Sequence, residues 1–391
     1  MKHIHLKNFG PINDADITFG DLTVLVGPQA SGKSLFAQLV KAVEDAGAIR
    51  TDLKSHGFDW LHGKDLVSDY CSLYFGGGLG GLVTADTTLQ VDGKNRSFGA
   101  VAKPAGNANA AEKVFLIPAQ RVLVLQDGWP RPFMSYSAGD PYCIRHFSDS
   151  LRMLMEGGLG SKGAVFPQTK QLKAELKALV NDSIYVGAKL KLETEGMRKR
   201  IVLSQDDNQP ALPYSAWSAG QREFTPLLLG LYRLMPSAKV STRGDLELVI
   251  VEEPEMGLHP QAIVSFGLLV LELLHRGYRV IVSTHSPVIL DLVWALRELK
   301  ELMPKAATQA LKKVFGLPSV TAQVQAIFSS ALTKEYRTYY FDRTAKGTIA
   351  RDISTLDPGS DDAMIAGWGG LSGFSGSIAD TVGDAMLEGG K

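Results

Sequence analysis

Four short stretches carry residue types that could do phosphate chemistry. The first, "GPQASGKS" at residues 27–34, follows the apolar run "DLTVLV" and precedes a segment with helical spacing. Glycines at this spacing let backbone N–H groups point at phosphate oxygens, and the helix N-terminus adds positive dipole. Lys33 is expected to reach the terminal phosphates, and the Ser34 hydroxyl is expected to bind Mg²⁺. The expected nucleotide-binding residues are Gly27, Pro28, Gln29, Ala30, Ser31, Gly32, Lys33 and Ser34.

The second stretch, "ELVIVEEPEMGLHP" at residues 247–260, ends an apolar run on Glu252 and Glu253. An unpaired buried carboxylate costs several kcal/mol of stability, so two adjacent glutamates at this position indicate a compensating interaction. A phosphate loop needs a second acidic site on a neighbouring strand. We expect Glu252 to hold Mg²⁺ and Glu253 to act as the general base that orients and deprotonates the attacking water. The alternative is that both glutamates only form salt bridges.

Two further stretches bear on the same chemistry. "SAGQRE" opens a helix, with Ser218 as a suitable N-cap and Gly220 permitting close approach of a phosphate. A Ser-x-Gly helix start is common, so this motif alone is weak. "STHSP" follows the apolar run "YRVIV" and puts His285 at the carboxyl end of a strand, where ligands collect in open parallel sheets. His285 could contact the γ-phosphate, although a lone histidine is more often a structural group.

Composition limits the remaining possibilities. The chain has 391 residues, 45% of them hydrophobic and 21% charged, as in ordinary globular proteins. Lys and Arg number 41 and so do Asp and Glu, so no global field favours nucleic acid or a membrane surface. Cys71 and Cys143 are too few for a disulfide framework. The opening "MKHIHLKNFG" has no apolar signal core, and the apolar stretch 263–282 contains Glu272. We therefore expect a cytoplasmic protein.

Short apolar strands alternate with helices along the chain. This alternation predicts an α/β fold with a mainly parallel sheet covered on both sides. A segment of alternating residues, "AKLKLETEGMRKRIVLS", predicts a hairpin that turns at Gly196. The other expected elements are strands within 2–26, a helix after Lys33, a helix at 222–235, a strand at 246–251, a helix at 261–275 and a strand in "YRVIVST".

Taken together, the chain resembles an ATP-binding-cassette (ABC) ATPase, closest to the SMC/RecF-like and OLD-like branch. The resemblance rests on "IHLKNFGPINDADITFGDLTVLVGPQASGKS", on "SAGQREFTPLLLGL" as a signature helix, on "VIVEEPEMGLHPQA" as Walker B and D-loop, and on "IVSTHSP" as a switch histidine. "IPAQR" and "WGGLSGFS" are similar to small members without a coiled coil. This resemblance implies a P-loop NTPase with an ABC-type head, an antiparallel N-terminal β lobe and a helical lid.

The resemblance also implies a composite site. Two copies would sandwich two ATP molecules, and the signature of one copy would cap the γ-phosphate bound by the other. Residues 256–259 would line that dimer interface as the D-loop. Gln120, or alternatively Gln126, would be the glutamine that couples Mg²⁺ to the lobes. The implied signature residues are Ser218, Ala219, Gly220 and Gln221.

Several positions depart from the family pattern. Gln29 replaces an Asn that is usual in SMC-like loops, and Glu252 replaces the common Asp, so metal ligation could be looser. No long heptad run separates Gln120 from Ser218, which excludes a coiled-coil arm. OLD-like nucleases carry a metal-binding Toprim domain after the switch histidine, but here no apolar strand ends in Glu-Gly. We interpret the late acidic residues Asp352, Asp357, Asp361 and Asp362 as solvated loop.

The expected parts are an ATP-binding lobe at 1–120, a helical and hairpin lid at 121–210, a lobe with the signature, Walker B and switch histidine at 211–345, and a Gly-rich acidic segment at 346–391. The expected function is a Mg²⁺-dependent ATPase that dimerises around ATP as a motor or switch in DNA maintenance or phage defence. The alternative is a non-catalytic ATP-binding scaffold that regulates a nuclease or toxin partner. Lys and Arg gathered in 170–200, from Lys170 to Arg200, predict contact with DNA or a partner protein, or simply a solvated face.

Overall fold

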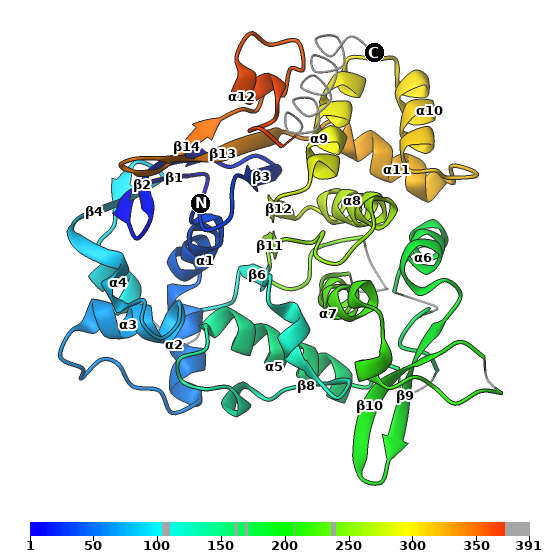
Figure 1. Cartoon of the computed structure of the whole chain (residues 1–391), viewed down its shortest axis with the longest axis horizontal. Helices are drawn as coiled ribbons and strands as arrows, with labels where there is room; N and C mark the ends of the chain where they lie inside the picture. The colour runs from blue at the N-terminus through cyan, green and yellow to red at the C-terminus, as the bar shows by residue number, and fades with distance from the viewer. Residues whose placement is uncertain (104–109, 161–162, 169–170, 207, 236–239, 372–391) are drawn as a thin grey trace, which may run out of the picture.

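The computed structural model describes residues 1–391 except 104–109, 161–162, 169–170, 207, 236–239 and 372–391. Ten strands form one sheet that crosses the molecule (Figure 1). In spatial order they are β5 (Lys94–Asn95), β4 (Val83–Val91), β1 (His3–Phe9), β2 (Ile12–Thr18), β14 (Gly347–Asp352), β13 (Tyr336–Thr344), β3 (Leu22–Val26), β12 (Arg279–Thr284), β11 (Leu248–Glu252) and β6 (Val114–Ile117). The part from β13 to β6 is parallel, whereas β1, β2 and β4 pair antiparallel. The expected α/β class, with its antiparallel N-terminal strands, is confirmed.

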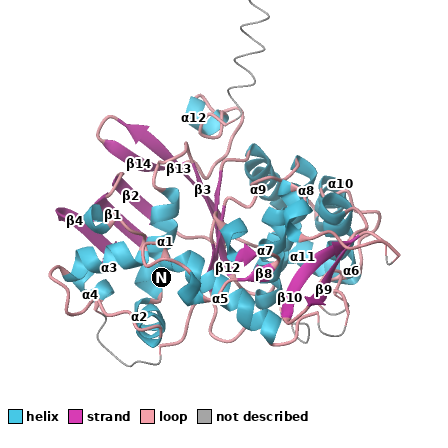
Figure 2. Ribbon diagram, turned by 60° about the horizontal axis from the view of Figure 1, so that its bottom comes forward, coloured by secondary structure: helices cyan, strands magenta, loops and turns pink. Residues whose placement is uncertain are grey.

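Helices cover both faces of the parallel strands. Figure 2 shows β3 and β12 side by side in the middle of the molecule, between these helices. The helices are α1 (Lys33–Glu44), α2 (Ala46–Ser55), α3 (Leu66–Tyr74), α4 (Phe98–Ala102), α5 (Tyr142–Glu156), α6 (Ala174–Val180), α7 (Ala219–Leu234), α8 (Pro260–His275), α9 (Pro287–Lys300), α10 (Pro304–Val314), α11 (Ala322–Ala331) and α12 (Ala363–Ala366).

The buried strand β11 shows why both faces need cover. Ile250 packs into a cluster with Phe36 of α1, while its neighbours Val249 and Val251 pack into a second cluster with Leu228 of α7. All of these side chains are fully buried. Because successive strand residues point to opposite faces, an apolar run without alternation requires a helix on each side.

The predicted hairpin forms between β9 (Lys189–Glu195) and β10 (Arg198–Ser204), with Gly196 at its turn. It projects away from the sheet in Figure 1. The short pair β7 (Leu125–Gln126) and β8 (Trp129–Pro130) lies near its base. The expected helices and strands around 33, 222–235, 246–251, 261–275 and 279–284 are confirmed within a few residues.

The C-terminal part of the sheet was not expected. β13 and β14 pair with each other and join β3 to β2, so late residues complete the sheet between two early strands. The predicted boundary at 345/346 lies in the turn of this hairpin, and the division into four parts stays a prediction. Asp357, Asp361 and Asp362 are exposed outside the strands, as interpreted, but the exposed Asp352 is the last residue of β14, so the loop prediction is wrong there. The described residues contain no acidic, histidine or cysteine cluster that could hold a metal ion.

No helix among the described residues is long and apolar enough to cross a membrane.

Candidate nucleotide site

Three parallel strands end beside each other at one edge of the sheet. The register pairs Val26, the last residue of β3, with Thr284, the last residue of β12. The last residue of β11 pairs with the residue before Thr284. The next residue of each strand is therefore Gly27, His285 or Glu253, and all three leave the sheet at the same edge. Ligands of open parallel sheets bind at this carboxyl edge.

The loop after β3 depends on its glycines. Gly27 has φ 148° and Gly32 has φ 94°, a region that favours glycine. A Cβ at Gly27 would lie 2.7 Å from the Phe341 carbonyl oxygen, and one at Gly32 would lie 2.8 Å from Cγ1 of Ile12. The loop thus turns sharply against β13 and β2 before α1 begins at Lys33. This is the strand–loop–helix context that the phosphate-loop prediction requires.

The Lys33 side chain turns back into the loop. Its Nζ donates to the carbonyl oxygens of Gly27 at 2.8 Å and Pro28 at 3.0 Å. It also lies 3.2 Å from Nε2 of His285. Burial lowers the pKa of Lys33 to about 8. The ammonium group therefore stands at the centre of the loop, beside the switch histidine.

Glu253 and His285 face each other across the strand ends. Oε1 of Glu253 lies 3.4 Å from Nε2 of His285, and this contact holds the pKa of Glu253 below its usual range. Glu253 is therefore charged at neutral pH and can accept a hydrogen bond from water. Glu255 fixes the histidine backbone, because its Oε1 accepts from Oγ1 of Thr284 at 2.8 Å and from N of His285 at 2.5 Å.

Glu252 is completely buried beneath the loop. Its Oε2 accepts from the Ala119 N–H at 3.1 Å, whereas the buried Oε1 has no hydrogen-bond partner in the described part of the chain. Burial raises the pKa of Glu252 to about 7, although a hydrogen bond from the Ser34 side chain opposes that rise. The Ser34 hydroxyl and the Glu252 carboxylate, with its unsatisfied Oε1, form a donor set that fits Mg²⁺.

A hollow of about 290 Å³ opens over the loop. It brings together most of the predicted phosphate-loop residues with the predicted base and the switch histidine. Its lining residues are Pro11, Gln29, Ala30, Ser31, Gly32, Lys33, Ser34, Leu35, Glu253 and His285. This lining combines a cation, a carboxylate and an imidazole at a helix N-terminus, as phosphoryl transfer to water requires.

The signature residues lie elsewhere. Ser218 caps α7 by accepting from the Gln221 N–H at 3.3 Å, and Gln221 Oε1 accepts from the Ser218 N–H at 3.1 Å. Ser218 and Ala219 are exposed and do not line the hollow. A Cβ at Gly220 would lie 2.9 Å from the Gly257 carbonyl oxygen. Within one copy, therefore, the D-loop carbonyl oxygen of Gly257 occupies the space beside Gly220 that the sequence analysis predicted for a phosphate.

The two candidate glutamines are in different surroundings. Gln120 follows Ala119, whose N–H binds Glu252, so it borders the expected metal site. Gln126 instead lines a hollow beneath the hairpin together with Arg198. This placement favours Gln120 as the coupling glutamine, and its role stays a prediction.

Three residues of the site were missed from the sequence. Glu255 was not singled out, although it lies two residues after Glu253, and Arg121 and Glu223 were quoted only inside larger motifs. Arg121 is completely buried and forms an ion pair of 3.6 Å with Glu223. A charged residue inside an apolar run, as in "IPAQRVLVL", is the signal that could have found it.

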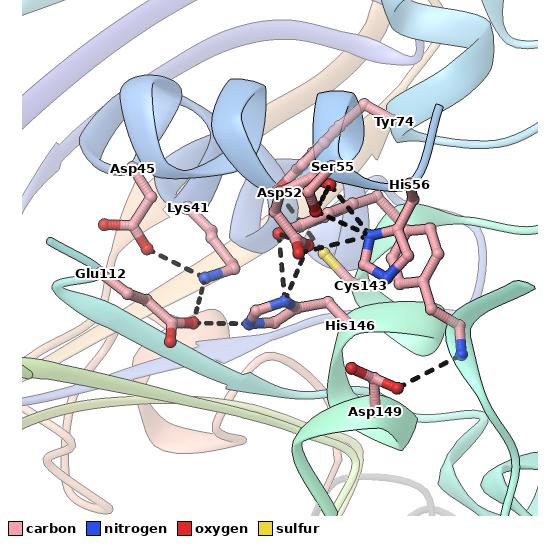
Figure 3. A network of polar contacts seen from close by, with 12 residues as sticks. Lys41, Asp45, Asp52, Ser55, His56, Tyr74, Glu112, Cys143, His146 and Asp149 are labelled. Carbon is pink, nitrogen blue, oxygen red and sulfur yellow. Dashed lines mark hydrogen bonds and ion pairs between the residues drawn. The ribbon is translucent and has the colours of Figure 1, made fainter. Parts of the chain in front are cut away.

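A second polar cluster is buried away from the strand ends (Figure 3). His146 of α5 binds Oε1 of Glu112 at 2.8 Å and Oδ2 of Asp52 at 3.2 Å. Lys41 of α1 donates to Glu112 at 2.9 Å and to Asp45 at 2.9 Å. The cluster joins α1, α2 and α5 and borders a hollow of about 360 Å³. It contributes no group to the nucleotide site.

Comparisons with known proteins agree with the order of the motifs. A family model described as "AAA domain, putative AbiEii toxin, Type IV TA system" matches residues 144–291, which include the signature, the paired glutamates and the histidine. An OLD nuclease of Thermus scotoductus is 23% identical over 348 residues, or 74% of this chain. The chain is therefore similar to OLD-like proteins and to AbiEii-type AAA domains. The match spans 60% of the length of the OLD nuclease.

Two SMC head structures are also similar to this chain. A head bound to the C-winged helix domain of ScpA is 11% identical with a TM-score of 0.44, over 90% of this chain and 96% of that chain. The head domain of Thermotoga maritima is 12% identical with a TM-score of 0.36, over 90% and 98%. Likeness at these scores carries no information about substrates or partners.

Proposed function

We propose that this OLD-like protein hydrolyses ATP with Mg²⁺ at the hollow over the phosphate loop. The observation that carries the proposal is the convergence of Lys33, Glu253 and His285 in one hollow, next to Ser34 and the buried Glu252. Mg²⁺, held by Ser34 and Glu252 with Gln120 nearby, would neutralise charge on the phosphates.

The protein's own groups have separate roles in this proposal. Backbone N–H groups of residues 29–32 and the Lys33 ammonium hold the phosphates. Glu253 accepts a hydrogen bond from the attacking water and takes its proton. His285 contacts the γ-phosphate and, through its 3.4 Å contact, keeps the Glu253 carboxylate aimed at the hollow. Because the pKa of Glu253 is lowered, its main contribution is to orient the water rather than to act as a strong base.

We propose further that the active form is a homodimer. The signature residues Ser218 to Gln221, of which Ser218 and Ala219 are exposed, do not line the hollow of their own copy. In a dimer they would cap the γ-phosphate bound to Lys33 of the other copy. Hydrolysis would then release the two copies from each other.

Subunit mixing tests this arrangement. Lys33→Met should abolish ATP binding, and Ser218→Arg should block the cap, so each variant alone should be inactive. Mixing the two creates dimers in which one site has an intact Lys33 and an intact Ser218. Turnover restored by mixing supports the composite site. Persistent inactivity of the mixture, with both variants folded, would show that Lys33 and Ser218 must act within the same copy, whereas activity of Ser218→Arg alone would show that Ser218 has no part in the reaction.

We propose that the ATPase acts as a motor or switch in DNA maintenance or phage defence. The match to AbiEii-type and OLD sequences supports this proposal. The second candidate is a non-catalytic ATP-binding scaffold that regulates a nuclease or toxin, in which ATP binds but turnover is negligible. Turnover that depends on Glu253 distinguishes the enzyme from the scaffold.

Few basic residues of the segment 170–200 remain candidates for contact with DNA or a partner. Lys170 lies outside the described residues, Lys173 pairs with the buried Glu272, and Arg200 pairs with Glu193 at 2.8 Å. Arg198 and Lys199, at the exposed end of the hairpin, remain the strongest candidates for contact with DNA phosphates. Duplex DNA binding should weaken steeply with salt. Affinity that is unchanged in Arg198→Ala/Lys199→Ala would exclude the hairpin as the DNA contact.

A further inference from the structure

The Arg121 side chain joins two elements that carry different motifs. Its Nη1 donates to the Glu252 carbonyl oxygen at 2.9 Å, and its Nη2 donates to the Glu253 carbonyl oxygen at 3.0 Å. Its Nε donates to the Glu223 carbonyl oxygen in α7 at 3.1 Å. The guanidinium is completely buried, and the Glu223 carboxylate lies 3.6 Å away. Three directed hydrogen bonds to main-chain oxygens of two elements need the planar fork that arginine has and lysine lacks.

The peptide that Arg121 holds is a strained one. Glu253 has φ 42°, in the left-handed region that costs a residue with a side chain on the order of 1 kcal/mol or more. Its N–H donates to the Ser283 carbonyl oxygen at 2.8 Å, and its own carbonyl oxygen accepts from Arg121. The two bonds hold the peptide groups on both sides of the Glu253 Cα. Without these two hydrogen bonds the Glu253 backbone would relax and turn its carboxylate away from His285.

A second contact couples the same two elements. The Gly257 carbonyl oxygen lies where a Cβ of Gly220 would approach within 2.9 Å, so the D-loop touches the start of α7. Arg121 joins α7 to β11 three residues further along the helix, at Glu223. A movement at the exposed start of α7 therefore reaches the stretch from Glu252 to Gly257 at both of its ends.

We propose that Arg121 is a positioning residue that ties the signature helix to Glu253 and keeps Glu253 in its hydrolytic orientation. This inference rests on the proposed ATPase function. It goes beyond that function because Arg121 touches neither the phosphate loop nor the hollow. Arg121→Lys keeps the positive charge but cannot reproduce the three hydrogen bonds. We expect it to lower kcat at least tenfold while the affinity for ATP changes less than twofold.

Arg145→Lys is the matched control. Arg145 is also a completely buried arginine, but it donates to the Leu73 carbonyl oxygen at 2.8 Å and lies over the Phe133 ring, away from β11. It reports the general cost of shortening a buried arginine. Its kcat should stay within about twofold of the native value.

The experiment is a double-mutant cycle on MgATP turnover, with ATP affinity measured by calorimetry on each variant. If Arg121 acts through Glu253, adding Arg121→Lys to Glu253→Gln should cause no further loss. Additive losses, an unchanged kcat in Arg121→Lys, or an equal loss in Arg145→Lys would each overturn the inference. If Arg121→Lys does not fold, Arg121→Gln removes the buried charge and cannot make all three carbonyl bonds, because its amide has only two N–H donors. That variant should lower kcat without weakening ATP binding, and an unchanged kcat would contradict the link.

The same data separate this inference from the proposed function. Native turnover that depends on Glu253 but not on Arg121 overturns the positioning role alone. Native protein that binds ATP without Glu253-dependent turnover overturns both.

Discussion

The partly buried His146 cluster makes the stability of this protein depend on pH above neutrality. His146 lies between Glu112 and Asp52, close to Tyr142, whose hydroxyl donates to Asp52 at 2.8 Å. Lys41 lies on the far side of Glu112. Burial alone would lower the pKa of His146, but the Glu112 charge and the two carboxylate hydrogen bonds raise it to about 9. The imidazolium is the form that the fold stabilises.

The size of the effect follows from linkage. A histidine with a pKa of about 9 in the folded state and about 6.5 in the unfolded state contributes roughly 3 kcal/mol while both states are protonated, since one pKa unit is worth about 1.4 kcal/mol. Because the folded pKa is raised, this contribution is fully present below pH about 6.5 and is lost as pH rises through about 9. At pH about 7.5 roughly 2 kcal/mol should remain.

Urea denaturation at pH values from 6 to 9.5 measures this loss. His146→Gln keeps hydrogen-bonding capacity but cannot titrate, so the stability difference between native protein and variant should shrink as pH rises. Contributions from other groups, such as Glu252 and Lys33, cancel in that difference. The control is His62→Gln, because the His62 side chain is 87% exposed and should give no pH-dependent difference. A constant difference between native protein and His146→Gln across this range would refute the reasoning.

Two further outcomes concern the nucleotide site. Because burial lowers the pKa of Lys33 to about 8 and phosphate needs the ammonium form, ATP affinity measured by calorimetry should fall as pH rises above about 8, and a flat profile from pH 7 to 9.5 would contradict this. Gly220→Ala would bring a Cβ within 2.9 Å of the Gly257 carbonyl oxygen, so turnover should fall at least tenfold, whereas Gly81→Ala, with open space around it, should be neutral. Equal turnover rates for the two alanine variants would show that the D-loop can shift away from the new Cβ without affecting hydrolysis.

The grouping of residues in the candidate nucleotide site was largely predictable because its parts are local motifs. The loop 27–34 needs only glycine spacing, and Glu253 and His285 each follow a short apolar strand. Parallel strands with a common carboxyl edge then bring the motifs together without further information. Prediction failed where pairing is distant along the chain. Arg121 lies more than 100 residues from each carbonyl group it binds, so neither periodicity nor spacing reveals those contacts.

Two other features were hidden for the same physical reason. β13 and β14 insert between β3 and β2, and a strand's neighbours cannot be inferred from its own composition. His146 and Asp52 meet across 94 residues, and each looks like an ordinary polar position in its own helix. Gly220 was correctly singled out, but for a phosphate; in one copy it instead admits the Gly257 carbonyl oxygen.

The central claim is that Glu253 drives Mg²⁺-dependent ATP hydrolysis in a dimer. The most direct measurement is turnover per subunit at increasing protein concentration, for the native chain and for Glu253→Gln. The predicted rate per subunit rises with protein concentration in the native chain and is lost in Glu253→Gln. That variant should instead accumulate as an ATP-bound dimer. ATP binding with negligible turnover that Glu253→Gln leaves unchanged would contradict the claim.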